Sequence, residues 1–292
     1  MGSETMNGFE KAMELLPREL RRSIGENAAE RAEELRLRIG RAPELVAAGE
    51  SLLLNAPAVD EEQIMRVLEK ATGASIHSAA PELSGGYIGY KGLRIGVCGT
   101  GVIREGGLSG FRDYSSLNIR IPREHRGICD GIIQSLYARG FENTLILSPP
   151  GGGKTTALRE FIRRLADGGQ ALSVVDERNE LSASDKGRAQ FDLGRCSDVL
   201  VGVPKAEAAI MLLRGMGPKI IAMDEITHGR DMEAVTQIFG CGVGILATAH
   251  GESVDSLRSR TLYRELLDRQ IFKNMVTIRQ KGGARIYEAE RI

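Results

Sequence analysis

A glycine-rich segment between two regular elements constrains this 292-residue chain more than any other feature. The segment reads SPPGGGKTT over residues 148–156. It follows the apolar run TLILS and precedes a helix-forming run that begins ALRE. Glycines let backbone N–H groups turn inward at the start of a helix, where they bind phosphate groups. The segment therefore predicts a strand, a phosphate-binding loop and a helix, in that order.

The loop fits the P-loop pattern GxxxxGK[ST] at its last three positions and departs from it at the first, where Ser148 replaces glycine. Lys154 is predicted to reach the β- and γ-phosphates of a nucleotide, and Thr155 to ligate Mg²⁺. The alternative is a flexible glycine turn without a ligand, and the serine puts the phosphate affinity in question. The predicted nucleotide-binding residues are Pro150, Gly151, Gly152, Gly153, Lys154, Thr155 and Thr156.

A second signal lies about 70 residues later, where the apolar run IIAM is followed by two acids, Asp224 and Glu225. Carboxylates at the carboxyl end of a strand lie where open α/β sheets bind their ligands. Asp224 is predicted to hold Mg²⁺, directly or through water. Glu225 is predicted to polarise an attacking water as a general base.

Two other predicted strands end in polar residues. The run ATAHG at residues 247–251 places Thr248 and His250 where they would contact a γ-phosphate or the attacking water, although a lone histidine is often structural. The run VVDERNE at residues 174–180 offers Glu177 to orient water or Mg²⁺ and Arg178 to pair with phosphate. A solvated charge run at a strand end is the alternative for the second of these.

Hydrophobic patterning predicts the architecture around these residues. Apolar runs at 144–148, 171–176, 198–203, 219–224 and 243–248 read as buried strands, and they alternate with helical segments at 154–167, 205–216 and 231–239. This alternation predicts a mainly parallel sheet flanked by helices. Residues 272–280 and 285–291 are predicted to form a closing hairpin around Gly282 and Gly283.

The first part of the chain reads differently, as a separate α+β domain. Helices are predicted at 9–16, 18–31 and 60–72, the last with Asp60 as its N-cap and Gly73 as its stop. A strand is predicted at 34–39, and the glycine-rich stretch 85–110 suggests an antiparallel sheet with turns and bulges. The predicted domains are residues 1–120 and 121–292, with the boundary near residues 120–127.

Composition disfavours several classes of protein. Lys and Arg number 39 and so do Asp and Glu, so the net charge gives no global attraction to nucleic acid or an anionic membrane. Only 4% of residues are aromatic and none is Trp, which leaves little for base stacking. The four cysteines are widely spaced, as expected of free thiols in a reducing cytoplasm. No apolar run reaches the ~18 residues that a membrane span needs.

These elements together resemble the RecA-like secretion ATPases of type II and type IV systems. Residues 213–226 (LRGMGPKIIAMDEI) are similar to that family's arginine–proline lead-in to its second acidic strand, and residues 247–250 to its histidine box. Over nearly the whole chain the sequence also resembles the stage III sporulation protein AA family of endospore-forming bacteria. The segments that carry this second resemblance are ELRLRIG at 34–40, GGYIGYKGLRIGVCG at 85–99, SPPGGGKTT and VVDERNE.

The resemblance implies a RecA-like P-loop core and a Mg²⁺-dependent ATPase in the cytoplasm of the mother cell. It implies ATP hydrolysis coupled to membrane proteins of a channel complex between mother cell and forespore. It also implies a ring-shaped homo-oligomer, a hexamer, in which a neighbour's arginines complete each ATP site. The candidate donors are Arg36, Arg38, Arg94, Arg104, Arg120 and Arg123. Asp224 stands where many secretion ATPases carry glycine, so metal coordination would differ from theirs.

Other functions stay open on the sequence alone. RecA-like cores also drive nucleic-acid motors, and the basic residues Arg120, Arg123 and Arg126 would suit contacts with phosphates. A scaffold that assembles on binding ATP and hydrolyses it negligibly is a second alternative, which the intact Glu225 disfavours. A small-molecule kinase fits less well, because no arginine cluster of the kind found in a lid follows the core.

Overall fold

A computed structural model describes residues 8–24, 32–47, 49–73, 75, 83, 85–104, 106–122, 124–281 and 284–292. The chain divides into two compact units. The first comprises residues 1–123 together with residues 185–188, and the second comprises residues 124–184 and 189–292. Within the described residues, no helix is both long and apolar enough to cross a bilayer.

The first unit is built on a six-stranded antiparallel sheet with strand order β3-β2-β1-β6-β5-β4. Two long strands, β5 and β6, form its main hairpin, and β6 also pairs with β1 so that Leu35 lies opposite Ile119. The strands are β1 (Ala32–Arg38), β2 (Glu44–Ala47), β3 (Glu50–Leu53), β4 (Tyr87–Tyr90), β5 (Leu93–Arg104) and β6 (Gly107–Arg120).

The helices of this unit pack on the sheet through one shared core. They are α1 (Gly8–Leu15), α2 (Arg18–Arg22) and α3 (Glu61–Ala71). Leu15, Leu20 and Leu68 are buried in that core with Leu35 and Ile119. Asp60 caps α3 in a capping box with Gln63, as the sequence predicts. The helix predicted over 18–31 ends at Arg22 as far as the chain is described, and residues 25–31 lie outside the described residues.

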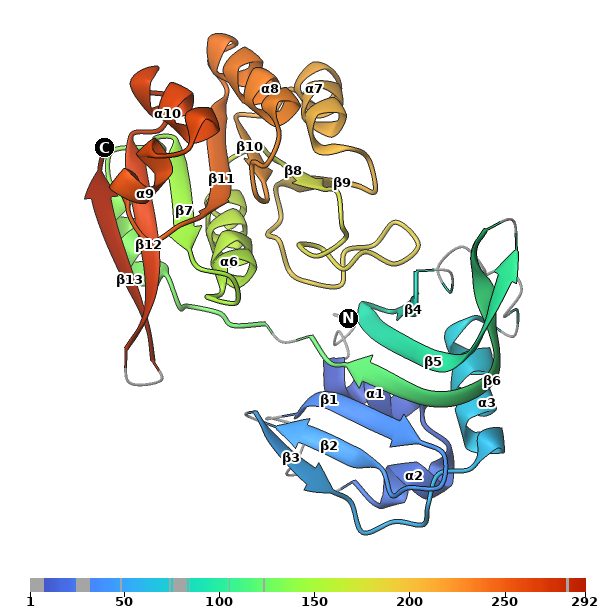
Figure 1. Ribbon diagram of the computed structural model, residues 1–292. Coiled ribbons are helices and arrows are strands. Elements are labelled where there is room, and N and C mark those ends of the chain that lie inside the picture. The colour runs from blue at the N-terminus through green and yellow to red at the C-terminus, as the bar shows by residue number, and fades with distance from the viewer. Residues whose placement is uncertain are drawn as a thin grey trace. The chain divides into compact units, whose positions relative to one another are not determined.

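The second unit contains a seven-stranded sheet with order β13-β12-β7-β11-β10-β8-β9 (Figure 1). Strands β12, β7, β11, β10, β8 and β9 pair in parallel, and β13 returns antiparallel to β12. The strands are β7 (Thr144–Ser148), β8 (Leu172–Asp176), β9 (Ser197–Val201), β10 (Ile220–Met223), β11 (Gly244–His250), β12 (Asn274–Lys281) and β13 (Ala284–Arg291).

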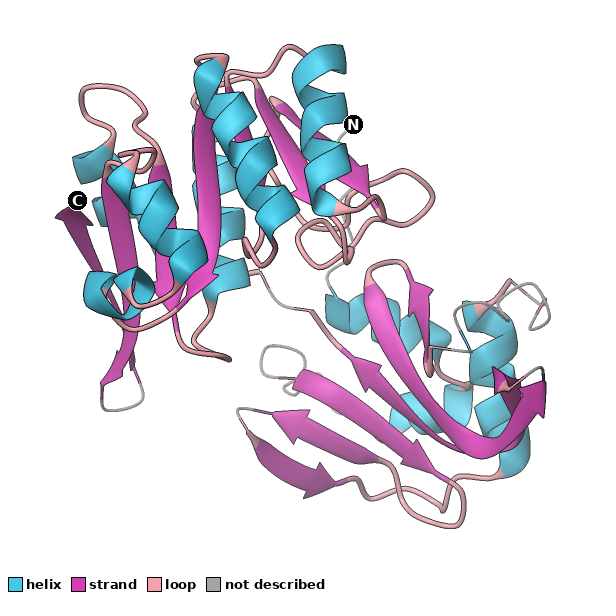
Figure 2. Cartoon of the chain, turned by 45° about the horizontal axis from the view of Figure 1, so that its top comes forward, coloured by secondary structure: helices cyan, strands magenta, loops and turns pink. Residues whose placement is uncertain are grey.

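Helices cover both faces of this sheet (Figure 2). Alternate residues of β7 enter different cores: Ile146 packs with α5 and α6, whereas Leu145 and Leu147 pack with α7, α8 and α10. Phe161 of α6 is completely buried and fills the first of these cores. The helices are α5 (Asp130–Leu136), α6 (Lys154–Asp167), α7 (Lys205–Gly215), α8 (Gly229–Gly240), α9 (Val254–Arg258) and α10 (Thr261–Asp268).

One expected strand of this sheet occurs but is less buried than the sequence predicts. Residues 198–203 were expected to form a buried strand, but β9 lies at the edge, and its residues are only partly buried or exposed. An edge strand has a neighbour on one side only, so its apolar residues receive less cover from the helices. The other four expected strands and the helix over 154–167 occur where the patterning places them.

Candidate active site

The candidate site lies at the carboxyl ends of three neighbouring parallel strands. β7 leads into the glycine-rich loop, β10 ends just before Asp224, and β11 ends at His250. β11 lies between the other two, with His250 paired to Ser148 of β7 and Ala247 paired to Met223 of β10. This strand order brings Lys154 and His250, 96 positions apart in the sequence, to the edge where open α/β sheets bind ligands.

The three loop glycines meet two different structural requirements. Gly151 and Gly153 have φ of +73° and +99°, a region that disfavours residues with a Cβ. Gly152 has no such φ, but a Cβ on it would lie 1.8 Å from the hydroxyl oxygen of Ser148. The Ser148 hydroxyl donates to the Pro149 carbonyl, 2.9 Å away. The serine that departs from the P-loop pattern is therefore accommodated because residue 152 is glycine.

The loop lysine, histidine and acid predicted from sequence form one hydrogen-bonded chain. Lys154 Nζ lies 2.7 Å from Nδ1 of His250 and 3.4 Å from the Ser148 carbonyl oxygen. On the other side of the imidazole ring, Nε2 lies 2.9 Å from Oε2 of Glu225. An ammonium group can only donate, so we assign Nδ1 as the acceptor and Nε2–H as the donor to Glu225.

Burial of Lys154 sets its electrostatics. The residue is only 8% exposed. Burial lowers the pKa of the ammonium below its usual value, against the opposing influence of Glu225 and Asp224. The site therefore holds a partly desolvated cation that a bound anion would stabilise.

Asp224 is held by two hydrogen bonds to the same oxygen. Its Oδ1 accepts from the Thr248 hydroxyl at 2.8 Å and from the Glu225 backbone N–H at 2.9 Å. These contacts orient the carboxylate at the end of β10. No group of three or more His, Cys, Asp or Glu side chains suited to a metal occurs among the described residues. An oxygen site of one carboxylate and the Thr155 hydroxyl is what Mg²⁺ uses when phosphates and water complete its shell.

The first acidic segment does not join this cluster. The Asp176 carboxylate is buried and accepts hydrogen bonds from three backbone N–H groups and the Ser182 hydroxyl, so it stabilises the loop that follows β8. Glu177 is exposed, and its carboxylate lies 3.9 Å from Nζ of Lys205. Arg178 is exposed as well. The structure thus places the predicted residue Glu177 beside Lys205 and not beside the loop lysine, Lys154.

Sequence reasoning missed Lys205, the first residue of α7. Its ammonium donates to the Glu225 carbonyl and lies 4.0 Å from the buried carboxylate of Asp231. It therefore supports the backbone on which the Glu225 side chain is mounted. A lysine in the first turn of a helix interacts unfavourably with the helix dipole. This unusual position was the one signal in the sequence that Lys205 has a specific role.

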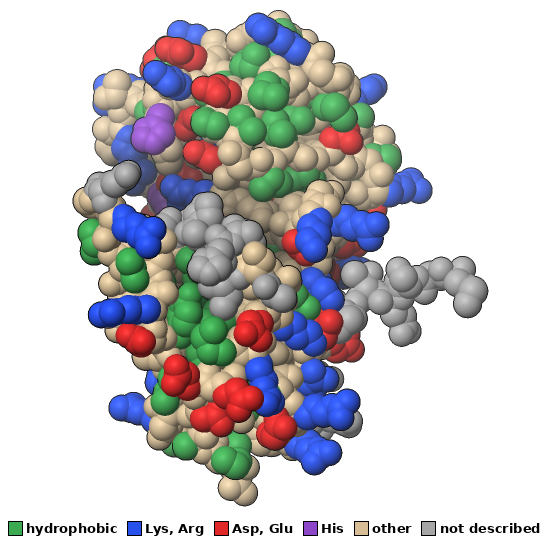
Figure 3. Space-filling view, turned by 90° about the vertical axis from the view of Figure 1, so that its right-hand side faces the viewer, with side chains coloured by type: hydrophobic (Ala, Val, Ile, Leu, Met, Phe, Trp, Pro, Cys, Tyr) green, Lys and Arg blue, Asp and Glu red, His purple; other side chains and the backbone are tan. Residues whose placement is uncertain are grey.

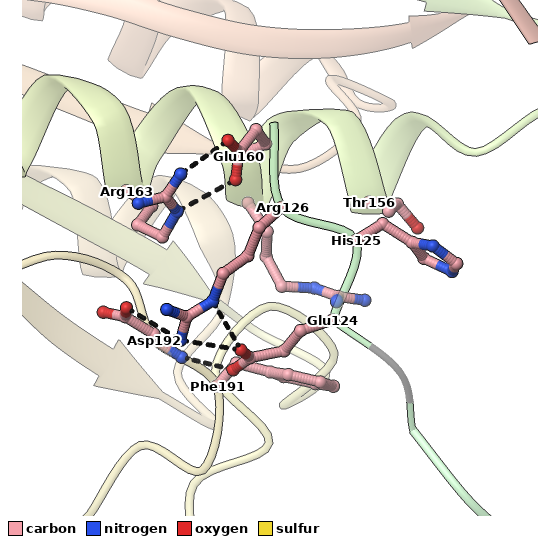
Figure 4. A pocket seen from close by; sticks show the side chains of 9 residues that line it. Glu124, His125, Arg126, Thr156, Glu160, Arg163, Phe191 and Asp192 are labelled. Atoms are coloured by element: carbon pink, nitrogen blue, oxygen red, sulfur yellow. Dashed lines mark hydrogen bonds and ion pairs between the residues drawn. The ribbon is translucent and has the colours of Figure 1, made fainter. Parts of the chain in front are cut away.

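A small open pocket lies beside α6 (Figure 4). Thr156 and Arg159 of α6 line it, and the Arg159 guanidinium stacks over the Phe191 ring at 4.0 Å. An acid–base network closes the pocket, with Arg126 bound to both Glu124 and Asp192. Thr156, a predicted nucleotide-binding residue, thus faces a pocket that is also lined by Arg126, one of the basic residues that the sequence offered for contacts with phosphates.

Comparison with solved structures identifies the class of fold. The chain is similar to the ATPase DotB of Legionella pneumophila, with a TM-score of 0.59 and 16% identity over 89% of this chain and 76% of that one. It is also similar to the pilus retraction motor PilT solved with bound ADP, with a TM-score of 0.63 and 17% identity over 91% of this chain and 81% of that one. The predicted RecA-like α/β fold is confirmed.

Sequence comparison identifies the family more narrowly than the fold does. The chain matches the family described as Sporulation stage III, protein AA over residues 6–288 and belongs to it. It is 32% identical over 279 residues to the stage III sporulation protein AA of Bacillus subtilis (strain 168), covering 92% of this chain and 91% of that protein. A more distant similarity, 31% identity over 48% of this chain and 21% of the other, links it to the protein SEEDLING PLASTID DEVELOPMENT 1 of Arabidopsis thaliana.

Proposed function

We propose that the protein is a Mg²⁺-dependent ATPase. The observation that carries the proposal is the contact chain from Lys154 through His250 to Glu225 at the carboxyl ends of β7, β11 and β10. It joins a phosphate-binding cation at the start of a helix to a carboxylate that can accept a proton. ATP supplies the polyphosphate that such a loop binds and the bond that an activated water would break.

Each residue of the chain has a role in this proposal. Lys154 leaves His250 and turns to the β- and γ-phosphates when ATP binds, while the loop amides bind the phosphate oxygens. Glu225 orients the attacking water and accepts its proton. His250 fixes the Glu225 carboxylate through its Nε2–H, and it changes partners when Lys154 moves.

Thr155 and Asp224 would hold the Mg²⁺. The metal supplies charge neutralisation at the β- and γ-phosphates. The two hydrogen bonds on Oδ1 keep the Asp224 carboxylate oriented for that role, directly or through water.

We further propose that the active form is a ring, a hexamer in keeping with the secretion-ATPase resemblance, which acts in the mother-cell cytoplasm on membrane proteins of a sporulation channel. The arginines that could complete a neighbour's ATP site differ in whether they already contact other side chains. Arg36 and Arg38 bind Glu44, Arg120 lies 3.7 Å from Glu34, and Arg94 stacks over Tyr87. Arg104 is exposed, whereas Arg123 lies outside the described residues. Arg104 is therefore our first choice for mutation.

No observation favours a nucleic-acid motor over this proposal. Of the basic residues that suggested one, Arg126 is paired with Glu124 and Asp192, and Arg120 lies near Glu34. On the face shown in Figure 3, basic side chains are interspersed with acidic ones rather than gathered in one broad patch. A surface of this kind gives little of the phosphate attraction that drives non-specific nucleic-acid binding.

Steady-state Mg-ATP hydrolysis measured against protein concentration tests the proposal. We expect specific activity to rise with concentration, because a neighbour's arginine contributes about 10³–10⁵-fold in rate where it operates. The activity should also be lost on chelation of Mg²⁺. A specific activity that does not depend on concentration would support ATP hydrolysis but contradict a site shared between subunits. ATP binding without hydrolysis at any concentration would replace the enzyme with an ATP-gated scaffold.

The lowered pKa of Lys154 predicts proton uptake on ATP binding at alkaline pH. Burial favours the neutral amine in the empty site, whereas bound phosphates favour the ammonium. Between the two pKa values, binding must therefore take up a proton, up to about one per site. Calorimetry in buffers of different ionisation enthalpy should show a proton uptake that increases as the pH is raised from neutrality toward the usual pKa of a lysine. An uptake that stays at zero over this whole range would contradict the prediction.

A further inference from the structure

The β12–β13 hairpin extends past the end of the strand that leads into the P-loop. β12 pairs with β7 from Asn274 to Thr277, opposite Thr144 to Leu147. The pairing between β12 and β13 continues further, to Lys281 opposite Ala284. The last residues of β12 and the first of β13 therefore project beyond the carboxyl edge of the sheet, on the side of β7 away from β11 (Figure 1).

This projection places Arg285 against the P-loop. A Cβ built on Gly153 would lie 2.9 Å from Nε of Arg285 and 3.1 Å from its Cζ. Gly153 is the N-cap of α6, the residue directly before Lys154. The guanidinium thus lies beside the start of the helix whose backbone amides are expected to bind phosphates, and it comes from the same chain.

No acidic side chain of the described residues pairs with the Arg285 guanidinium. Among the described residues, no hydrogen bond or ion pair joins the Arg285 side chain to another group, whereas Arg279 of the same hairpin lies 3.5 Å from Glu288. Arg285 lies beside the N-terminus of α6, which carries partial positive charge. An arginine held against another positive group is stabilised when an anion binds between them.

We propose that Arg285 contacts the phosphates of the bound nucleotide as a second cation supplied in cis. The inference rests on the proposed function and extends it. Phosphate binding would then use the loop amides, Lys154 and a guanidinium from the C-terminal hairpin. Nucleotide binding would also couple the P-loop to the position of this hairpin, because the arginine bridges them.

ATP affinity of Arg285 variants, measured by calorimetry, tests the proposal. A charge-assisted hydrogen bond contributes about 1.5–3 kcal/mol, so Arg285→Gln should weaken ATP binding about tenfold to hundredfold. Arg285→Lys should restore part of the affinity because it keeps the charge. Arg279→Gln is the matched control: it removes an exposed cation from the same hairpin and should leave ATP affinity close to that of the wild type.

Two comparisons separate the possible failures. Arg285→Met keeps aliphatic bulk against Gly153 and removes the charge, so wild-type ATP affinity in this variant would show a packing role only and overturn the proposal. The loss in Arg285→Gln should be larger for ATP and ADP than for AMP, and an equal loss for all three would likewise overturn it. If the wild type bound no ATP at all, the proposed function itself would be wrong. If the wild type binds ATP and Arg285→Gln binds it equally well, only the inference about Arg285 is wrong.

Discussion

Glu225→Gln should lower the rate of ATP hydrolysis by about 10²–10⁴-fold, the usual contribution of a positioned general base. The variant should still bind ATP, because the amide oxygen of glutamine can accept the hydrogen bond from His250 Nε2 that the carboxylate accepts now. The change therefore removes the proton acceptor and keeps the contact chain. Single-turnover hydrolysis and ATP affinity, measured on the same preparation, separate the two effects.

Glu252→Gln is the matched control for that experiment. Glu252 lies two residues beyond His250 and is exposed, and its backbone N–H donates a hydrogen bond to the Ser256 hydroxyl oxygen. The substitution removes a carboxylate of the same kind from the same edge of the sheet and should leave hydrolysis near the wild-type rate. Hydrolysis that survives in Glu225→Gln would contradict the assignment of the base. Loss of ATP binding together with hydrolysis would show that Glu225 acts through the structure of the site.

Local signals in the sequence predicted the loop and its helix well. Residues 154–167 form α6 as expected. Glycines flank the helix at both ends, Gly153 before Lys154 and Gly168 after Asp167. Asp60 similarly marks the start of α3 through a capping box whose members are three residues apart. Features of this kind depend on contacts within one turn of the chain, so patterning alone reveals them.

Contacts between distant segments were beyond the sequence. His250 and Glu225 were each singled out, but their contact depends on β11 lying next to β10, which no residue pattern specifies. Lys205 and Arg285 were missed for the same reason, since each reaches the site only through the way α7 and the β12–β13 hairpin pack. In the sequence, Ser148 is only a departure from the P-loop pattern. The structure shows how the loop accommodates it, because a Cβ at position 152 would lie 1.8 Å from its hydroxyl oxygen.

Gly152→Ala should damage the P-loop, and a second substitution should repair it. The added Cβ would lie 1.8 Å from the Ser148 hydroxyl oxygen and 3.1 Å from the Pro149 carbonyl oxygen, so the serine side chain must turn away and the loop backbone must give as well. Overpacking of this kind costs about 1–3 kcal/mol in the free energy of unfolding. ATP affinity should fall at least about tenfold, because the loop amides no longer keep their positions.

The double variant Ser148→Gly/Gly152→Ala removes the obstructing hydroxyl and returns the first loop position to the glycine of the P-loop pattern. Gly152 has no positive φ, so once the serine side chain is gone an alanine there keeps one tight contact, 3.1 Å to the Pro149 carbonyl oxygen. Stability and ATP affinity should both recover in part, with a coupling of about 0.5–3 kcal/mol between the two positions.

Gly131→Ala in α5 is the control for Gly152→Ala, since a Cβ there meets no atom within 4 Å. It should stabilise the protein by about 0.4–1 kcal/mol and leave ATP affinity unchanged. Additive effects in the double variant would show that Ser148 and Gly152 are independent. The serine would then not be the reason that position 152 requires glycine.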